Sequence, residues 1–542
     1  MSEQIATTVR GGIVVTADGA TRADIAISTT GKIAAIAPSL PPGPEDIDAT
    51  GLYVLPGGVD SHCHIEQKTS TGLTPCDNFY SASVAALAGG TTTLIPFACQ
   101  HRGGRVRDVV AAYRQLAAKA ACDYAFHIIV ADPAEPHAID DLKACFADGF
   151  SSVKVYMTYD ALKLKDDEML DVLALCRAHG AMVMVHAESH ELIGWITRRL
   201  LSADRIQAKY HAVARPAIAE REAAHRAITF AELIDTPLLI VHVSSASAAD
   251  EIARARARGL PIYGETCPQY LYLTQQALCA PSFEGNKFLC SPPLRTERDQ
   301  VALWSALRRG DLQVVSSDHS AYNFEGGAAS KTAGGPSTPF SKIPMGLPGL
   351  ECRMPLMVSG ALKGTLAAEA CASCGPPQSG GTSDEAKIEG LVKAVNTCCT
   401  MPAKLYGLYP RKGTIEVGSD ADIALWDCDS ADAAYTITKS VLHDSLDYTP
   451  YEGMSAKGKV TRTLLRGKTA FQYGFHNMRT GSFTKRGVGM FLPTGKPSLP
   501  GWSGEASWPD AGDIVEQRCA QTLGEAHDCG PVGGGRKRPI DS

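Results

Sequence analysis

The sequence predicts an α/β protein, a (β/α)₈ TIM-type barrel with a flanking β-sandwich domain formed by both chain ends. Two observations predict this fold. Short apolar segments alternate with segments of helical period through the middle of the 542-residue chain. Segments of β texture with turn signals stand at both ends. In such a barrel the active site lies at the carboxyl ends of the strands.

The barrel is expected at residues 53–405. Short apolar segments predict its eight strands, at 53–59, 91–98, 124–130, 151–157, 181–186, 238–243, 260–265 and 312–317. Segments of helical period separate the strands, at 77–89, 105–121, 166–178, 217–235, 246–258 and 297–309. Residues 366–389 are rich in Ala, Gly, Ser and Cys and predict a surface insertion, which a helix at 390–405 follows.

The two chain ends complete the predicted architecture. Residues 1–52 and 406–475 return to short β segments with turn signals, so we expect them to form one β-sandwich together. Residues 476–542 are rich in Gly, Pro and Ser and show no sustained period. They predict an extended arm, which a neighbouring subunit could receive, or a partly disordered tail.

Composition excludes several classes of function. The chain has 52 basic and 58 acidic residues and a net charge of −6, so it has no basic field for nucleic acid or anionic lipid. It has no apolar run long enough to cross a membrane and no secretion signal at its start, so we expect a cytoplasmic protein. The 17 cysteines are odd in number and fit reduced thiols. Cys371 and Cys374 have redox spacing, but they lie in the predicted insertion.

Metal-binding residue types stand at the ends of the predicted strands. The stretch PGGVDSHCHIEQ carries His62 and His64, whose rings share a face in an extended chain. His186, His242 and Asp318 stand at the ends of the fifth, sixth and eighth strands. Each alone has an ordinary alternative, a core histidine bonded to backbone or an aspartate that caps a helix. Their joint placement predicts a metal site.

The number of ligands predicts two metal ions and a bridging anion. One tetrahedral catalytic zinc uses three protein ligands and keeps one position open. The four imidazoles and one carboxylate found here are more ligands than one such ion needs. Lys154, in the fourth strand, is an ammonium with no acceptor. A buried lysine with a lowered pKa can capture carbon dioxide as a carbamate, which offers two anionic oxygens. The alternative is a strand lysine paired with an acid.

These residues resemble the dihydropyrimidinase and hydantoinase family of amidohydrolases. The matching stretches follow the family's order from about residue 8 to 472, and they are PGGVDSHCHIEQ, LAGGTTTLIPFA, SSVKVYMTYD, VMVHAES, LIVHVSS, GETCPQYL, SPPLR, SSDHS and KGTIEVGSDADIALWD. The resemblance implies a site with two zinc ions bridged by Lys154 as N6-carboxylysine. The ligands that it implies are His62, His64, Lys154, His186, His242 and Asp318.

The resemblance also implies roles in catalysis and substrate binding. Tyr159 matches the tyrosine that polarises the substrate carbonyl, although an aromatic residue after a strand can also simply pack. Asp318 would act as general base and then as general acid. Ser291 matches a residue whose backbone helps to hold the substrate ring. Met345 stands where the family usually has an asparagine that contacts the substrate ring. The identity of the ring is therefore not decided by the resemblance.

Three functions follow as candidates. The first is ring opening of a dihydropyrimidine or a 5-substituted hydantoin to an N-carbamoyl amino acid, by a homotetramer as in relatives. The second is hydrolysis of another ring, such as allantoin, a barbiturate or a cyclic imide. The third is a non-catalytic scaffold of the same fold, which the retained ligands disfavour.

Two observations concern the substrate. Dihydroorotases usually place an arginine two positions after the second histidine of HxH, where this chain has Glu66, so a neutral ring is favoured. The loops after the first strands offer candidate pocket walls, which are Leu73, Phe79, Gln100, His101 and Arg102.

Overall fold

The centre of the molecule is a closed parallel barrel. The computed structural model describes residues 4–69, 72–367, 383–473 and 482–499. The barrel sheet runs in the order β16-β15-β14-β13-β12-β11-β9-β8-β17, and every pair along it is parallel. The strands are β8 (Gly58–His64), β9 (Thr91–Cys99), β11 (His127–Ile129), β12 (Ser152–Tyr156), β13 (Met182–His186), β14 (Leu238–Ile240), β15 (Ile262–Thr266), β16 (Val314–Val315) and β17 (His319–Ser320). A short strand, β10 (Asp123–Tyr124), pairs with β9 beside this path.

The eighth barrel strand is split, and the split closes the ring. β16 pairs with β15, whereas β17 pairs with β8. Residues 316–318 lie between the two pieces and belong to neither ladder. The predicted (β/α)₈ class is therefore confirmed, and the break lies at Asp318.

The first predicted strand is wrong in one respect. Residues 53–59 were expected to form one barrel strand, but β7 (Tyr53–Pro56) belongs to the flanking sheet and only β8 enters the barrel. The chain changes sheet at Gly57, whose amide donates to the Asp422 carbonyl. A Cβ atom on Gly57 would lie 2.2 Å from Thr92 Oγ1. An apolar run continues through this change, so its pattern does not reveal it.

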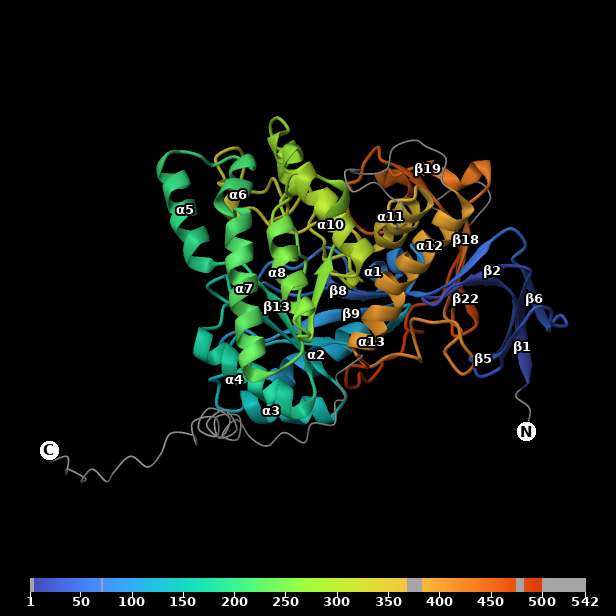
Figure 1. The fold of residues 1–542 in the computed structure, drawn as a ribbon. Coiled ribbons are helices and arrows are strands. Elements are labelled where there is room, and N and C mark those ends of the chain that lie inside the picture. The colour runs from blue at the N-terminus through green and yellow to red at the C-terminus, as the bar shows by residue number, and fades with distance from the viewer. Residues whose placement is uncertain (1–3, 70–71, 368–382, 474–481, 500–542) are drawn as a thin grey trace, which may run out of the picture.

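The helices cover the outside of the barrel (Figure 1). They are α1 (Phe79–Ala88), α2 (Val106–Ala117), α3 (Ala138–Ala147), α4 (Asp166–His179), α5 (His190–Ser202), α6 (Lys209–Ala214), α7 (Ala217–Ile234), α8 (Ala246–Ala257), α9 (Pro268–Tyr272), α10 (Glu297–Arg309), α11 (Leu350–Leu362), α12 (Asp384–Val395) and α13 (Met401–Leu405). Short helical turns are η1 (Gln275–Cys279), η2 (Glu284–Phe288), η3 (Phe340–Lys342), η4 (Asn396–Thr400), η5 (Ala431–Ala433) and η6 (Lys439–Val441).

Local sequence explains where such a helix begins and ends. α10 starts after Thr296, whose hydroxyl accepts from the Asp299 amide while the Asp299 carboxylate accepts from the Thr296 amide. It stops at Gly310, which adopts φ +79°. Leu303 and Leu307, one turn apart, are buried against the barrel.

The insertion expected at residues 366–389 ends earlier than predicted. α12 begins at Asp384, inside the range 366–389, and packs against α11. Ser383 caps it by accepting from the Ala386 amide, so the polar start of this helix looked like loop in the sequence. Residues 368–382, with the spaced cysteines Cys371 and Cys374, lie outside the described residues.

Both chain ends build the flanking β-domain, as expected. One sheet has the order β5-β4-β1-β6 and the other β23-β22-β21-β18-β7-β2-β3. Their strands are β1 (Ile5–Arg10), β2 (Ile13–Val15), β3 (Ala20–Arg22), β4 (Asp24–Ser28), β5 (Ile33–Ala37), β6 (Glu45–Asp48), β18 (Ile423–Asp427), β21 (Lys459–Leu465), β22 (Lys468–Gln472) and β23 (Ser482–Phe483). A separate pair is β19 (Ala434–Thr436) with β20 (Ser455–Lys457). Figure 1 shows the first and last strands together on one side of the barrel.

A buried ion cluster joins this domain to the barrel. Lys412 Nζ lies 2.7 Å from Asp123, 3.0 Å from Asp420 and 2.7 Å from Asp422. Asp123 is on β10, whereas the other two carboxylates precede β18. Arg466 pairs with Asp123 from the far end of β21.

The described part of the predicted arm packs on its own chain. β23 pairs with β22, and Phe491 forms a bridge with Tyr124. Leu492 is fully buried, and the Thr494 hydroxyl accepts from the Ser151 amide at 2.8 Å. Residues 484–499 therefore close the amino-terminal end of the barrel.

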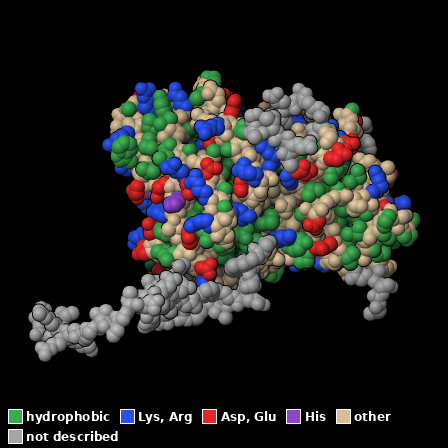
Figure 2. Space-filling model, in the orientation of Figure 1, with side chains coloured by type: hydrophobic (Ala, Val, Ile, Leu, Met, Phe, Trp, Pro, Cys, Tyr) green, Lys and Arg blue, Asp and Glu red, His purple; other side chains and the backbone are tan. Residues whose placement is uncertain are grey.

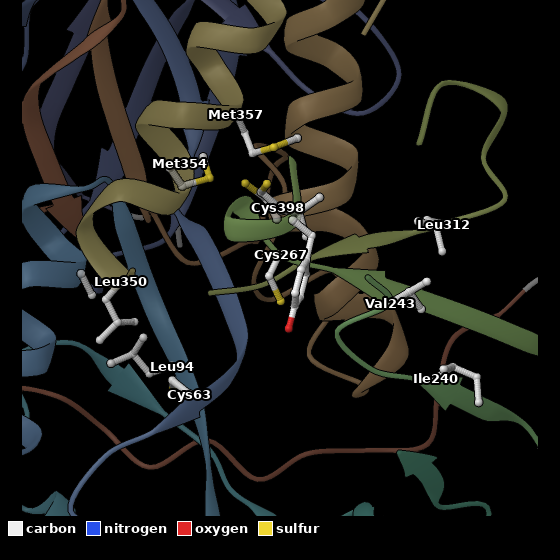
Figure 3. Close-up of a cluster of buried hydrophobic side chains, with 14 of the residues drawn as sticks. Cys63, Leu94, Ile240, Val243, Cys267, Leu312, Leu350, Met354, Met357 and Cys398 are labelled. Carbon is white, nitrogen blue, oxygen red and sulfur yellow. The ribbon is translucent and has the colours of Figure 1, made fainter. Parts of the chain in front are cut away.

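The main core lies between the barrel strands and the outer helices. Figure 3 shows part of it, where Met354 and Met357 of α11 lie beside Cys398. The 13 described cysteines are all free thiols. No helix among the described residues is long and apolar enough to cross a membrane. Acidic and basic side chains are mixed over the face that Figure 2 shows.

Candidate active site

The barrel brings the predicted ligands to one end. β8 carries His62 and His64, β12 carries Lys154, and β13 ends at His186. His242 follows β14, and Asp318 lies in the break of the eighth strand. Since parallel strands present their carboxyl ends at one rim, these six side chains converge there.

The backbone at this rim is strained. Eight non-glycine residues of the described chain have positive φ, and three of them line the cavity: Tyr159 (+70°), His242 (+40°) and Asp318 (+48°). Such conformations cost energy and persist where surrounding structure enforces them, which is common at functional sites.

Three ligand-type side chains form a compact group. Asp318 Oδ1 lies 3.3 Å from His62 Nε2 and 3.3 Å from His64 Nε2. One ligand atom from each of the three lies within 4.8 Å of the others. Burial would raise the pKa of Asp318, but the two imidazoles hold it below its usual range, so the carboxylate stays charged.

A second pair of histidines faces this group. His186 Nδ1 and His242 Nε2 approach to 2.9 Å, and the His62 and His242 ring centroids are 5.3 Å apart. Nδ1 of His242 is buried and has no hydrogen-bond partner among the described residues. Burial lowers the pKa of both rings, so neutral imidazoles with lone pairs are favoured.

Oxygen acceptors fix which ring nitrogen points into the site. His62 Nδ1 donates to Glu265 at 2.6 Å, and His64 Nδ1 donates to Gln67 at 2.7 Å. His186 Nε2 donates to Glu188 at 2.7 Å. The opposite nitrogen of each ring is then left with its lone pair toward the centre, which is the arrangement that metal-binding histidines need.

Lys154 lies beneath this cluster and is fully buried. Its Nζ is 3.4 Å from His62 Nε2 and 4.8 Å from the centre of the Phe97 ring. Burial lowers the pKa of this amine to about 8, although Glu265 and Asp318 oppose the change. A substantial neutral fraction at physiological pH makes the amine nucleophilic.

The donor set fits two metal ions. Acceptors fix the lone pairs of three imidazoles, burial favours the neutral form of His242, and the Asp318 carboxylate stays ionised. Lys154 could supply a bridging anion once carboxylated. His62, His64 and Asp318 form one close group, and His186 and His242 form a neighbouring pair, so the residues present could hold more than one ion.

A cavity of about 820 Å³ opens above the ligands. Among its walls are His64, Tyr159, His186, His242, Ser291, Asp318 and Met345. His62 and Lys154 lie below the lining and are fully buried. The structure therefore brings all the sequence-predicted site residues together, either in this cavity or directly beneath it.

The residues expected to meet substrate form one wall. The Tyr159 ring lies 5.1 Å from the Arg215 guanidinium. Burial raises the pKa of Tyr159, so its hydroxyl keeps its proton and can donate. Ser291 Oγ lies 3.1 Å from Met345 Sδ, which joins the two segments expected to hold the ring.

The candidate pocket walls divide into two groups. Leu73 and His101 line the cavity. Phe79 does not, since it is the first residue of α1 and is buried in the core. Gln100 is also buried, and its amide donates to the Gly104 and Asp132 carbonyls. Arg102 points away and donates to the Lys163 carbonyl.

Glu66 turns away from the cavity. Its carboxylate accepts from the Phe79 amide at 2.9 Å and pairs with Lys119 at 2.7 Å. It therefore anchors the start of α1, and it is not among the lining residues.

Several partners of the ligands were missed in the sequence. Glu265 is the last residue but one of β15, the seventh barrel strand, and could have been noticed in the sequence because the ends of the other strands carry functional groups. Glu188 pairs with Arg215, which comes from the end of α6. Burial raises the pKa of Glu188, but Arg215 and His186 bring it down to about 2. No local pattern indicates that pairing.

Comparisons with known proteins agree with this site. The family model described as the Amidohydrolase family matches residues 53–470. A D-hydantoinase from Rhizobium radiobacter is 39% identical over 482 residues, which cover 88% of this chain and 98% of that protein. A D-hydantoinase from Ralstonia pickettii is 38% identical with the same coverage. The crystal structure of a dihydropyrimidinase from Brevibacillus agri matches with a TM-score of 0.81 and 37% identity, over 91% of this chain and 100% of that one.

The chain belongs to the amidohydrolase family, whose model matches residues 53–470, the span that contains the barrel. Within that family it belongs with the D-hydantoinases and dihydropyrimidinases, to which it is similar over nearly the whole length of the relatives.

Proposed function

We propose that this enzyme opens a neutral cyclic amide ring by hydrolysis, taking a dihydropyrimidine or a 5-substituted hydantoin to an N-carbamoyl amino acid. The observation that carries the proposal is the convergence of five side chains at the base of one cavity, which are His62, His64, His186, His242 and Asp318. The names of the relatives support the reaction class.

The proposed cofactor is two zinc ions per subunit. The six side chains already described would hold them, with Lys154 as a bridging N6-carboxylysine. The burial and the lowered pKa of Lys154 support this modification, because carbon dioxide reacts with the neutral amine. When bound, the ions would lower the pKa of a water molecule toward neutrality and so supply a nucleophile.

The protein's own groups would manage protons and charge. The Asp318 carboxylate accepts the proton of the attacking water and returns it to the departing ring nitrogen, which breaks the amide bond. The Tyr159 hydroxyl donates to the carbonyl oxygen as that oxygen gains negative charge. The segments of Ser291 and Met345 hold the ring, and the contact between these two side chains supports their joint role.

The environment of Glu66 supports a neutral ring. An arginine at this position would be needed to hold a ring carboxylate in the manner of dihydroorotases. Glu66 is an anion, and its carboxylate is bound to the Phe79 amide and to Lys119, away from the cavity. This position therefore provides no cation for a carboxylate on the ring. Met345 favours a second candidate, the hydrolysis of another ring such as allantoin, a barbiturate or a cyclic imide. An asparagine amide both donates and accepts hydrogen bonds, whereas the methionine thioether is only a weak acceptor, so the two side chains suit different rings.

The proposal includes a cytoplasmic homotetramer. The free thiols of the described cysteines support a reducing compartment. The exposed apolar side chains of α5 to α7, which include Trp195 (52% exposed) and Ile218 (53%), support contact with further subunits.

A substrate panel with metal analysis tests the proposal. The purified enzyme is assayed with dihydrouracil, phenylhydantoin, allantoin and succinimide, and its zinc is counted in parallel. Ring opening of dihydrouracil or phenylhydantoin with about two zinc ions per subunit is expected. Removal of metal by a chelator should abolish turnover, and zinc should restore it. An active enzyme without metal, or a loaded enzyme inactive on all four rings, would refute the proposal.

A further inference from the structure

The cavity is far larger than the ring that the ligands would act on. A hydantoin has seven non-hydrogen atoms, which at about 30 Å³ each, the share of a water in the liquid, fill on the order of 200 Å³. The cavity holds about 820 Å³. Most of this space therefore belongs to whatever the ring carries.

The outer part of the cavity is cationic. Lys68, Arg198 and Lys342 line it, from the loop after β8, from α5 and from η3. None of the three has an ion pair with any described residue, and all three are exposed. Figure 2 shows basic side chains at the end of the molecule formed by α5 and α6.

The position of Arg198 follows from the sequence of α5. Gly194, one turn earlier, also lines the cavity and has no side chain. A Cβ atom placed on Gly194 would lie 3.4 Å from the Arg198 guanidinium, so the guanidinium rests over the bare glycine on the side of the helix that faces the cavity.

Acidic groups at the rim do not cancel this charge. Asp160 is the outer carboxylate among the lining residues of the described chain, and its oxygen lies 3.3 Å from His190 Nε2. Asp318 lies at the base among the ligands. Three unpaired cations against one carboxylate leave a positive rim on a protein whose net charge is −6. Charged clefts of this kind attract and orient ligands of opposite sign.

Part of the cavity wall is apolar. Ile193, Phe340 and Ile343 belong to the lining and are buried. A short hydrocarbon spacer could pack against these side chains, which would remove apolar surface from water.

We propose that the preferred substrate carries an anionic group at the end of its substituent, a neutral ring linked through a short carbon chain to a carboxylate. This inference rests on the proposed function. It adds the chemical class of the substituent, which the rim cations Lys68, Arg198 and Lys342 would recognise. The anion lies on the side arm, so it does not conflict with the absence of a cation beside the ring at Glu66.

The test compares two matched substrates on the complete zinc-loaded enzyme. Hydantoin-5-propionic acid carries the charge, and hydantoin-5-propionamide has nearly the same shape without it. At low salt the acid should show a kcat/KM about fivefold or more above that of the amide. About 0.5 M salt should remove most of this preference, since screening acts on exposed charges.

Variants locate the effect. Arg198→Gln and Lys342→Gln should each raise the KM for the acid about two- to fivefold and leave the amide unchanged, which is the range for one exposed ion pair. Arg199→Gln is the matched control. Arg199 is the next residue of α5, stacks on the Trp195 ring at 3.5 Å and does not line the cavity.

The outcomes separate the two proposals. Equal kcat/KM for acid and amide at low salt, or an equal effect of Arg198→Gln and Arg199→Gln, overturns the anionic substituent and leaves ring opening intact. Failure to open either hydantoin, together with dihydrouracil and phenylhydantoin, overturns both. The wild-type comparison needs no variant, so misfolding of a variant cannot obscure the result.

Discussion

Residues outside the predicted ligand set orient three of the four histidine rings at the site. Gln67, Glu188 and Glu265 each accept a hydrogen bond from one ring, and Glu188 is itself paired with Arg215. Since these acceptors lie in different loops and strands, the orientation of the rings depends on the whole rim being in place.

Lys154 gives the most direct test at this scale. Lys154→Ala should lose zinc and activity, because the bridging anion goes with the amine. Short carboxylic acids such as acetate should partly restore both by taking the place of the carbamate. Metal content and turnover are measured together, with Lys143→Ala on exposed α3 as the control. Full zinc occupancy with normal turnover in Lys154→Ala would contradict the bridge.

Tyr159 tests the stabilisation of charge on the carbonyl oxygen. Tyr159→Phe should lower kcat by about a hundredfold while zinc content stays at the wild-type level, as for loss of one donor to a developing oxyanion. Tyr473→Phe, outside the cavity, serves as the comparison. An unchanged kcat would remove the Tyr159 hydroxyl from the mechanism.

At the scale of elements, the contact between barrel and β-domain depends on charge inside the protein. Lys412 is almost fully buried among Asp123, Asp420 and Asp422. Lys412→Met should lower the free energy of unfolding by about 3–5 kcal/mol, because it leaves buried carboxylates without their cation. Urea denaturation measures this loss. Lys439→Met, at a partly exposed pair with Asp444, should cost less, and equal losses would refute the special role of the cluster.

The same cluster predicts a pH dependence. Burial raises the pKa of Asp420, but Lys412 and its other partners bring it down to about 2. The unfolded value is about 3.9, so this carboxylate stabilises the fold above that pH and the stabilisation is lost as pH falls toward 2. Asp420→Asn should flatten the fall in melting temperature between about pH 5 and pH 2. Asp432→Asn, an exposed carboxylate, should not.

The elements also show what the sequence could and could not predict. Periodicity located the barrel strands and most helices, and the histidines at strand ends pointed to side chains that the structure brings together at one rim. Periodicity could not show that β7 belongs to the flanking sheet and that the chain enters the barrel only after Gly57, because the apolar residues on both sides of Gly57 are equally buried. Nor could it find Arg215 beside Glu188, since 27 positions separate them and only the folded chain brings them together.

At the scale of the whole molecule, the resemblance and the exposed apolar residues of α5 to α7 predict a homotetramer. Light scattering on the purified protein should give about four times the subunit mass of 57.4 kDa. Trp195→Glu should shift the protein toward smaller species, because a carboxylate replaces a half-exposed apolar ring. Lys143→Glu, at an exposed position of α3 and outside α5 to α7, is the charge control. A monomeric wild type would refute the tetramer.

Residues 484–499 pack on the amino-terminal end of the barrel, and this contact affects the order in which the protein can fold during synthesis. Strand β7 ends at residue 56, yet its partner β18 begins only at residue 423, and Thr494 meets Ser151 still later. A ribosome therefore releases the early strands long before their neighbours exist. Contacts so distant along the chain slow folding and leave unpaired strand edges exposed in the meantime. The β7 edge that β18 covers and the Ser151 amide that Thr494 covers therefore stay without these partners until more than 300 further residues have been made.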